Sequence, residues 1–258
     1  MILLDGKSLS EKNLSDLKQK IENSRLKINL DIVLVGDNPS SLKYISLKQA
    51  KSKEIGISGH LYHLENFNSF TLKNIINYLN NRPQTTAFFI QLPITNCPNP
   101  IEFLKLINPK KDVDGLNPES GTTPAVVQGI ITLLKHYQIN FNNKNIVVVN
   151  DSQLIGQPLK KYFINFTSQI ILLNNQVKNI SQYTKEADIL ISATGVKNLI
   201  TGDMIKKGSV IVDVANGDVD FNSCSQKATY ITPTYGGIGP MTIASLLENC
   251  FYSPVPLL

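Results

Sequence analysis

The first half of the chain alternates between helical and strand-like hydrophobic patterns. Leu9, Leu14, Leu17 and Ile21 recur at helical spacing and predict an amphipathic opening helix over residues 7–24. Apolar runs at 30–35, 59–64 and 87–93 predict three strands, and the segments 39–55 and 71–80 predict the helices between them. Repeated strand and helix units predict a parallel sheet joined by right-handed crossovers.

A second alternating series follows Gly121. It consists of a predicted helix over 125–137, strands at 145–149, 169–173, 187–192 and 209–214, and a helix from the turn after 149 to about 165. This order is typical of a Rossmann-like sheet. The chain then passes through a glycine-rich segment, 232–242, into a predicted last helix over 243–251.

The turn between the strand at 145–149 and its helix has the layout of a dinucleotide-binding turn. It runs from Asn150 through Gly156 to Pro158, with a polar start and an early glycine. The first glycine of the usual fingerprint is absent. Asparagine tolerates the left-handed region, so Asn150 can adopt the positive φ that such a turn would need.

Several polar residues are expected at the carboxyl ends of the strands, where open α/β sheets bind ligands. Gln91 ends an apolar strand before a proline, and its alternative role is a plain strand-end hydrogen bond. Tyr44 and Lys48 are four residues apart, so they share one helix face behind the N-cap Asn38. Taken alone, this pair favours a solvated lysine beside a half-buried ring over a catalytic surface.

Two loops offer further candidate chemistry. Asp112 and Asp114 stand in a loop rich in Gly and Pro, where they could bind a metal, cap a helix, hold a polar ligand or simply line a solvated turn. The segment 232–242 has three glycines within four residues, which favours either an anion-binding loop or a plain turn into the last helix.

Composition narrows the class of protein. The 258 residues are 42% hydrophobic, enough for one large or two small folded domains, and no apolar run is long enough to span a bilayer. The three cysteines and three histidines show no metal-ligand or disulfide spacing, and the cysteines are expected to be reduced and buried. A net charge of +5 with scattered lysines indicates no nucleic-acid surface and suits an anionic small molecule. We therefore expect a cytoplasmic protein with no membrane or nucleic-acid partner.

Four motifs in this order resemble the bifunctional methylenetetrahydrofolate dehydrogenase/cyclohydrolase family. They are Tyr44-x-x-x-Lys48, Gln91-Leu-Pro, Lys111-Asp-Val-Asp114-Gly and Gly236-Gly-Ile-Gly-Pro-Met-Thr242. The last two are the most specific, and the resemblance covers nearly the whole chain.

The resemblance implies an α/β fold with two domains and a homodimer. Residues 1–120 form a folate-binding, catalytic parallel-sheet domain, which 237–258 complete with the C-terminal helix, and 121–236 form a Rossmann-like NAD(P)-binding domain. The folate lies in the cleft between them. The implied substrate-binding residues are Tyr44, Ser41, Gln91, Leu92, Pro93, Asp114, Gly237, Gly239 and Pro240.

The implied activity has two steps in one-carbon metabolism. Hydride passes from 5,10-methylenetetrahydrofolate to NADP or NAD, and water then opens the methenyl product to 10-formyltetrahydrofolate. By resemblance, Lys48 is the acid/base, Gln91 governs its charge, Tyr44 stacks on the folate and Asp114 hydrogen-bonds the pterin. A lysine beside a cationic substrate and an apolar ring would have a lowered pKa, which suits a base that activates water.

The sequence departs from the family at the cofactor half. Asn150-Asp151-Ser152 replaces Gly-Arg-Ser, so the arginine that holds the 2′-phosphate of NADP is missing. Asp151 repels such a phosphate and favours NAD, unless Lys178 compensates. The implied cofactor-binding residues are Asn150, Asp151, Ser152, Gly156, Pro158, Asn175, Ala193, Thr194, Gly195, Ala215 and Asn216.

These departures keep two other functions open. One is a cyclohydrolase that has lost productive cofactor binding, and the other is a non-catalytic paralogue that binds folate or forms oligomers. Retention of Lys48 argues against the second, because a protein that only binds needs no base.

Overall fold

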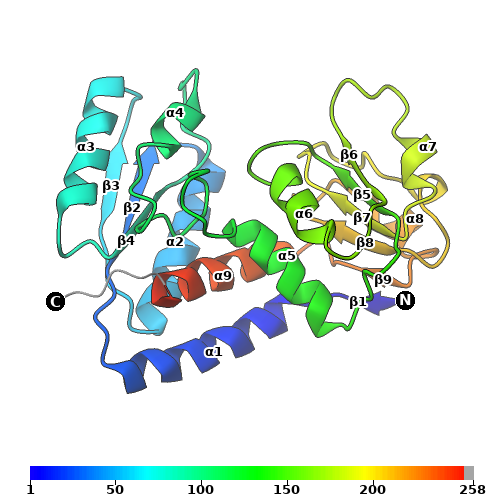
Figure 1. The fold of residues 1–258 in the computed structure, drawn as a ribbon, viewed down its shortest axis with the longest axis horizontal. Helices are drawn as coiled ribbons and strands as arrows, with labels where there is room; N and C mark the ends of the chain where they lie inside the picture. Colours follow the sequence, from blue (N-terminus) through cyan, green and yellow to red (C-terminus); the bar gives the residue numbers. More distant parts are fainter. Residues whose placement is uncertain (253–258) are drawn as a thin grey trace. The chain divides into compact units, whose positions relative to one another are not determined.

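The computed structural model describes residues 1–252, which form two compact units. The six-stranded unit comprises residues 1–11 and 126–242, and the three-stranded unit comprises residues 12–125 and the segment from residue 243 (Figure 1). All three boundaries between the units fall inside helices, which are α1 (Gly6–Ser24), α5 (Ala125–His136) and α9 (Ile238–Tyr252).

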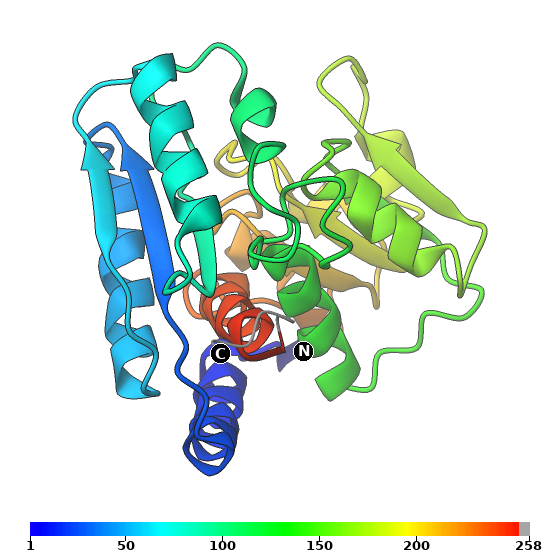
Figure 2. The same ribbon diagram turned by 60° about the vertical axis from the view of Figure 1, so that its left-hand side comes forward.

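The three-stranded unit is a parallel sheet in the order β3-β2-β4. Its elements are β2 (Leu30–Val35), α2 (Pro39–Glu54), β3 (Leu61–Leu64), α3 (Ser69–Asn81), β4 (Ala87–Ile90) and α4 (Pro100–Leu104). The chain crosses from β2 to β3 and then back to β4, so right-handed connections put α2 and α3 on opposite faces of the sheet (Figure 2). Every residue of β2 and β4 is buried, as their apolar runs predicted.

A loop covers the free edge of β4. The Phe88 amide donates to the Lys111 carbonyl at 3.0 Å, and Phe88 forms a parallel bridge with Asp112. The ammonium of Lys111 donates to the carbonyls of Leu79 and Arg82, both at 2.9 Å. These contacts fix the loop that carries Asp114 against the strand that leads to Gln91.

The six-stranded unit is a fully parallel sheet in the order β1-β9-β8-β7-β5-β6. Its strands are β1 (Ile2–Leu3), β5 (Ile146–Val149), β6 (Ile170–Leu173), β7 (Ile189–Ser192), β8 (Val210–Asp213) and β9 (Tyr230–Ile231). Its helices are α5 (Ala125–His136), which starts one residue before the unit, α6 (Gly156–Phe163), α7 (Ser181–Thr184), η1 (Gly202–Met204) and α8 (Phe221–Cys224). The strand order reverses between β5 and β7, which is the switch point where such sheets bind ligands.

The expected α/β architecture with parallel sheets is confirmed, with local corrections. The last helix starts at Ile238 rather than at 243, so Gly239 and Pro240 lie in a helical turn and not in a loop. The third strand ends at Ile90, before the cis Leu92–Pro93 peptide. Of the cysteines, Cys97 is only partly buried, although burial was expected for all three. Residues 253–258 of the predicted third range lie outside the described residues.

Candidate active site

Helix α2 carries the candidate base of the three-stranded unit. The Asn38 side chain accepts hydrogen bonds from the amides of Ser40 and Ser41, and Pro39 takes the first helical position. Gly56, with φ 85°, follows the C-terminal end. The cap fixes where the helix starts, and Tyr44 and Lys48 follow on one face.

Lys48 is buried among aromatic and amide groups. Lys48 is only 2% exposed, and its Nζ donates to Gln91 Oε1 at 3.0 Å. The same nitrogen lies 4.1 Å from the centre of the Phe89 ring and 5.1 Å from that of Tyr44. The alternative of a solvated lysine is therefore wrong.

Burial lowers the pKa of Lys48, because an ammonium loses hydration in this environment. The carboxylate of Asp114 opposes this change, and so, more weakly, does the Cys250 thiol on α9. Burial likewise raises the pKa of Asp114, and the charge of Lys48 lowers it. The site therefore holds an amine that loses its proton more readily than an ordinary lysine.

The Gln91 amide is oriented by a second contact. Its Nε2 donates to the Leu92 carbonyl at 2.7 Å, so its oxygen faces the lysine. A plain strand-end role for Gln91 does not account for this arrangement. Leu92 is partly exposed and Pro93 is exposed, next to this amide.

Two other predicted polar residues occupy different environments. Asp112 is 2% exposed and accepts hydrogen bonds from the amides of Gly115 at 3.1 Å and Asn117 at 2.8 Å, so it holds the loop together from inside. A solvated turn is therefore wrong for this residue. The Ser41 hydroxyl is buried and has no hydrogen-bond partner, which leaves it available to a ligand.

In the six-stranded unit, Asn150 organises the predicted dinucleotide turn. Its Oδ1 accepts from the Ser152 amide at 2.9 Å, the Ser152 hydroxyl at 2.7 Å and the Gly156 amide at 3.3 Å. Its Nδ2 donates to the Ala193 carbonyl after β7 at 2.7 Å. Asn150 does not have a positive φ, so the turn does not use the left-handed conformation that asparagine tolerates. The side chain, and not the backbone conformation, shapes the turn across the switch point.

Gly156 is required by a close backbone approach. A Cβ placed on it would lie 2.1 Å from the Asn150 carbonyl oxygen. Pro158, partly buried, occupies the first turn of α6. The amino end of this helix thus packs tightly on the end of β5, as in phosphate-binding turns.

Asp151 and Asn174 pair at the ends of β5 and β6. The Asn174 side chain donates to Asp151 Oδ2 at 2.8 Å. Both Asp151 and the neighbouring Asn175 are exposed, and so is Lys178. This edge therefore presents a carboxylate that is held in place but open to solvent.

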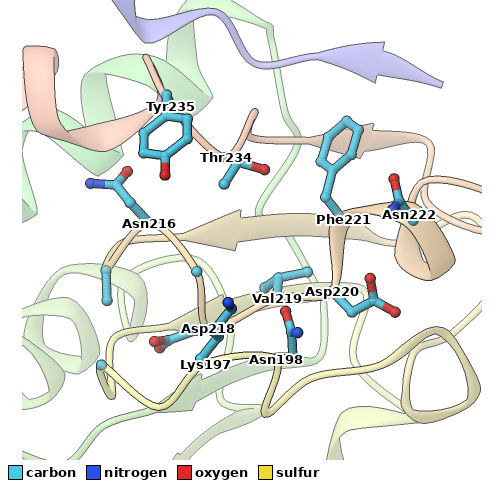
Figure 3. Close-up of a pocket in the computed structure, with 13 residues that line it drawn as sticks. Lys197, Asn198, Asn216, Asp218, Val219, Asp220, Phe221, Asn222, Thr234 and Tyr235 are labelled. Atoms are coloured by element: carbon cyan, nitrogen blue, oxygen red, sulfur yellow. The ribbon is translucent and has the colours of Figure 1, made fainter.

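An open pocket of about 530 Å³ lies at the ends of β7, β8 and β9 (Figure 3). Thr234 and Tyr235 lie on one side of it, and Lys197 and Asn198 lie on the other. Of the predicted cofactor residues, Gly195, Ala215 and Asn216 line this pocket.

Buried aspartates shape the loops around this pocket. Asp218 Oδ2 accepts from Ser192 Oγ at 2.7 Å and from the Thr194 amide at 2.6 Å. Asp213 Oδ2 accepts from the Gly217 amide at 2.8 Å, and burial raises the pKa of Asp213. The geometry of the segment after β8 therefore depends on these two carboxylates.

The glycine-rich segment ends in the first turn of α9. The Gly236 carbonyl accepts from the Lys7 amide at 2.8 Å, and a Cβ on Gly6 would lie 1.9 Å from the Gly237 carbonyl oxygen. Gly237 is buried, and Gly239 and Pro240 are partly buried. This segment is thus packed against the start of α1.

Sequence reasoning missed Phe89, Cys250 and Asp218 as neighbours of the predicted residues. Phe89 had a usable signal, because it stands two residues before Gln91 and side chains in a strand alternate between faces. Among residues 1–252, no group of three or more His, Cys, Asp or Glu side chains is arranged to hold a metal ion.

One unit is Rossmann-like and has an ordered dinucleotide-binding type of turn after β5, and the other is an α/β unit with the buried Lys48 amine. These two features together are typical of a two-domain enzyme of the nicotinamide-dependent class. The family models agree: residues 4–114 match the catalytic domain of tetrahydrofolate dehydrogenase/cyclohydrolase, and residues 124–254 match its NAD(P)-binding domain. The chain belongs to the tetrahydrofolate dehydrogenase/cyclohydrolase family.

Individual relatives are similar over their full lengths. The bifunctional protein FolD of Campylobacter jejuni is 38% identical, with 96% of each chain covered, and that of Thermodesulfovibrio yellowstonii is also 38% identical, with 97% of this chain and 96% of the relative covered. The crystal structure of the bifunctional enzyme FolD, methylenetetrahydrofolate dehydrogenase/cyclohydrolase, from Campylobacter jejuni superposes with a TM-score of 0.91 at 38% identity over 98% of both chains.

Proposed function

We propose that this protein oxidises 5,10-methylenetetrahydrofolate with NAD(P) and hydrolyses the methenyl product to 10-formyltetrahydrofolate. Matches to both family domains and to bifunctional relatives support this activity. The observation that carries it is the buried Lys48 amine held by Gln91 at 3.0 Å. Relatives that match over nearly all of their length disfavour a cyclohydrolase without cofactor and a non-catalytic paralogue.

In the hydrolytic step, Lys48 acts as the general base. Burial lowers the pKa of Lys48, so the amine gives up its proton more readily than an ordinary lysine, and its neutral form takes a proton from the water that attacks the methenyl carbon. Gln91 accepts a hydrogen bond from the amine and so fixes its position. The Tyr44 ring stacks on the folate, and Asp114 accepts a hydrogen bond from the pterin ring. Ser41 offers its unpartnered hydroxyl to the same ligand.

The turn after β5 fits a dinucleotide. NAD(P), when bound, accepts the hydride from the methylene carbon. The amide-rich start of α6 lies at the switch point, and Gly156 allows the pyrophosphate close to the backbone. Asn150, Asp151, Ser152 and Pro158 position this turn, while Asn175, Ala193, Thr194, Gly195, Ala215 and Asn216 lie at the ends of the neighbouring strands.

NAD is the preferred cofactor in this proposal. The second strand of a Rossmann unit ends near the adenine ribose, and here Asn174 at the end of that strand, β6, holds the Asp151 carboxylate, which follows β5. A carboxylate accepts a hydrogen bond from a 2′-hydroxyl and repels a 2′-phosphate.

The experiment that tests this function follows reduced nicotinamide with methylenetetrahydrofolate and follows methenyltetrahydrofolate hydrolysis separately. Lys48→Met should abolish hydrolysis, because a thioether cannot take a proton, and it should leave the circular dichroism spectrum unchanged. Lys51→Met on the same helix, where Lys51 pairs only with Glu54 at the surface, is the matched control. Full hydrolysis by Lys48→Met contradicts the assigned base, and absence of reduced nicotinamide with either cofactor contradicts the dehydrogenase.

A homodimer and a cytoplasmic location are further parts of this proposal that rest on the family alone. Sedimentation at several protein concentrations tests the first. Within residues 1–252, no helix has the length and apolar character needed to cross a membrane.

A further inference from the structure

The Phe89 ring lies closer to the amine of Lys48 than the Tyr44 ring does. The amine lies 4.1 Å from the ring centre, against 5.1 Å for Tyr44. Phe89 is on β4, and Gln91 directly follows the end of β4 with its amide still bonded to the Val33 carbonyl of β2, so the two side chains, two residues apart, both reach the Lys48 amine on α2. One strand thus supplies an aromatic face and an amide oxygen to a single nitrogen.

Burial strengthens the cation–π contact between Lys48 and Phe89. Phe89 is 1% exposed and Lys48 is 2% exposed, so water screens the attraction between the cation and the ring very little. Burial favours the neutral amine, whereas the ring face favours the ammonium. The titratable groups that face the amine from other elements are the Asp114 carboxyl on the loop, whose charge favours the ammonium, and the Cys250 thiol on α9, whose pKa is raised by burial so that it carries no charge.

We propose that Phe89 is a positioning residue whose ring face holds the Lys48 amine against Gln91 and keeps part of it protonated. The ring opposes burial, so the amine exchanges between its two forms instead of remaining neutral. For hydrolysis, this means that the Phe89 ring stabilises the ammonium that forms when the Lys48 amine takes a proton from water. The catalytic part of this inference rests on the proposed role of Lys48, whereas the effect of the ring on the amine does not.

Phe88 provides a matched control on the same strand. It is equally buried, at 0% exposure, but it is adjacent to Phe89 in sequence and therefore projects from the other face of β4. A change of ring electronics at 88 alters the core without reaching the amine.

The test replaces each phenylalanine in turn with pentafluorophenylalanine in the full-length protein. This residue keeps the shape of the ring and reverses the charge distribution on its face. Phe89→Leu is less suitable alone, because the space it leaves could admit water and raise the pKa of the amine. Titration of Lys48 is followed by NMR of ¹³C-lysine, and Lys48→Met assigns the resonance.

We expect the pKa of Lys48 to fall by about one unit with the fluorinated ring at 89, the scale of a desolvated cation–π contact. The same ring at 88 should leave it unchanged. An unchanged pKa with the ring at 89, or equal shifts from both positions, overturns the inference.

The pH profile of methenyltetrahydrofolate hydrolysis separates this inference from the proposed function. The acidic limb should move to lower pH by the same amount with the fluorinated ring at 89 and stay in place with that at 88. A shifted NMR titration with an unmoved limb overturns the link to catalysis. Hydrolysis that survives Lys48→Met overturns the base and leaves the ring effect standing.

Discussion

At the scale of single residues, the groups around the Lys48 amine determine whether it carries a proton. Gln91 holds the Lys48 amine with an uncharged oxygen, and that choice matters because a charged partner would fix the ammonium. The identity of residue 91 therefore decides whether the lysine can serve as a base near neutral pH.

Gln91→Glu should suppress hydrolysis by raising the pKa of Lys48. A carboxylate at the position of the amide oxygen shifts a neighbouring pKa by about one to three units, so the rate at pH 7 should fall by about tenfold or more. Activity should recover as the pH rises, since the amine then loses its proton. A rate profile measured from pH 6 to 10 checks this, and a uniform loss at every pH would show that Gln91 acts in another way.

Asp151→Ser should move cofactor preference toward NADP. Removing the carboxylate removes repulsion of the 2′-phosphate, so the ratio of kcat/KM for NADP to that for NAD should rise on the order of 10- to 100-fold. Lys178→Ala in the unchanged background is the companion variant. If that substitution selectively weakens NADP, Lys178 compensates for the missing arginine and the predicted preference for NAD is wrong.

At the scale of elements, the turn from β5 into α6 is held by one side chain and one close approach. Gly156→Ala puts a methyl group 2.1 Å from the Asn150 oxygen in the unrelaxed structure, so the turn must open. We expect about 1–3 kcal/mol of destabilisation, the scale of an overpacked site, and loss of cofactor binding with hydrolysis retained. Urea unfolding and calorimetric titration of NAD measure these effects. Lys160→Ala, an exposed change on the same helix, should alter neither.

The elements also show what sequence could and could not predict. Long periodic stretches such as α1 and the buried strand β2 were predicted closely, because burial imposes their pattern. Strands β1 and β9 have two residues each and carry no period. The start of α9 was missed because Gly239 and Pro240 are typical of loops, although proline is tolerated in a first turn.

The candidate site was predictable in part for a similar reason. Tyr44, Lys48 and Gln91 belong to recognisable motifs, and their proximity follows from the strand ends. The burial of Lys48 depends on residues distant in sequence, including Phe89 and Cys250, and no local pattern encodes such contacts. The hydrogen bonds of the Asn150 side chain could not be predicted either, since one asparagine can shape a turn through its backbone or its side chain.

At the scale of the whole molecule, neither unit is continuous in sequence. The core of the three-stranded unit includes side chains of α9 that follow residue 242. These buried residues are Ile243, Ala244, Leu246, Leu247 and Cys250. A fragment that ends after α4 and the following loop therefore lacks part of the hydrophobic core of the three-stranded unit.

A fragment of residues 1–125 should fail to fold cooperatively. Losing several buried aliphatic side chains at about 1.5–3 kcal/mol each exceeds the stability of a small domain. Circular dichroism with urea titration measures this. A fragment in which 243–258 are fused by a flexible linker to residues 12–125 should recover a cooperative transition, and a cooperative transition without them would show that α9 is dispensable.

The hydrogen bonds of the Asn150 side chain also have a consequence for how this position can vary. Its side chain makes four hydrogen bonds, to the Ser152 amide and hydroxyl, to the Gly156 amide and to the Ala193 carbonyl. Asn150→Gly would remove all four at once, because glycine has no side chain. A change of Asn150 alone therefore leaves several partners unpaired at once, and we expect this position to vary together with Ser152 and the residues around Gly156 rather than by itself.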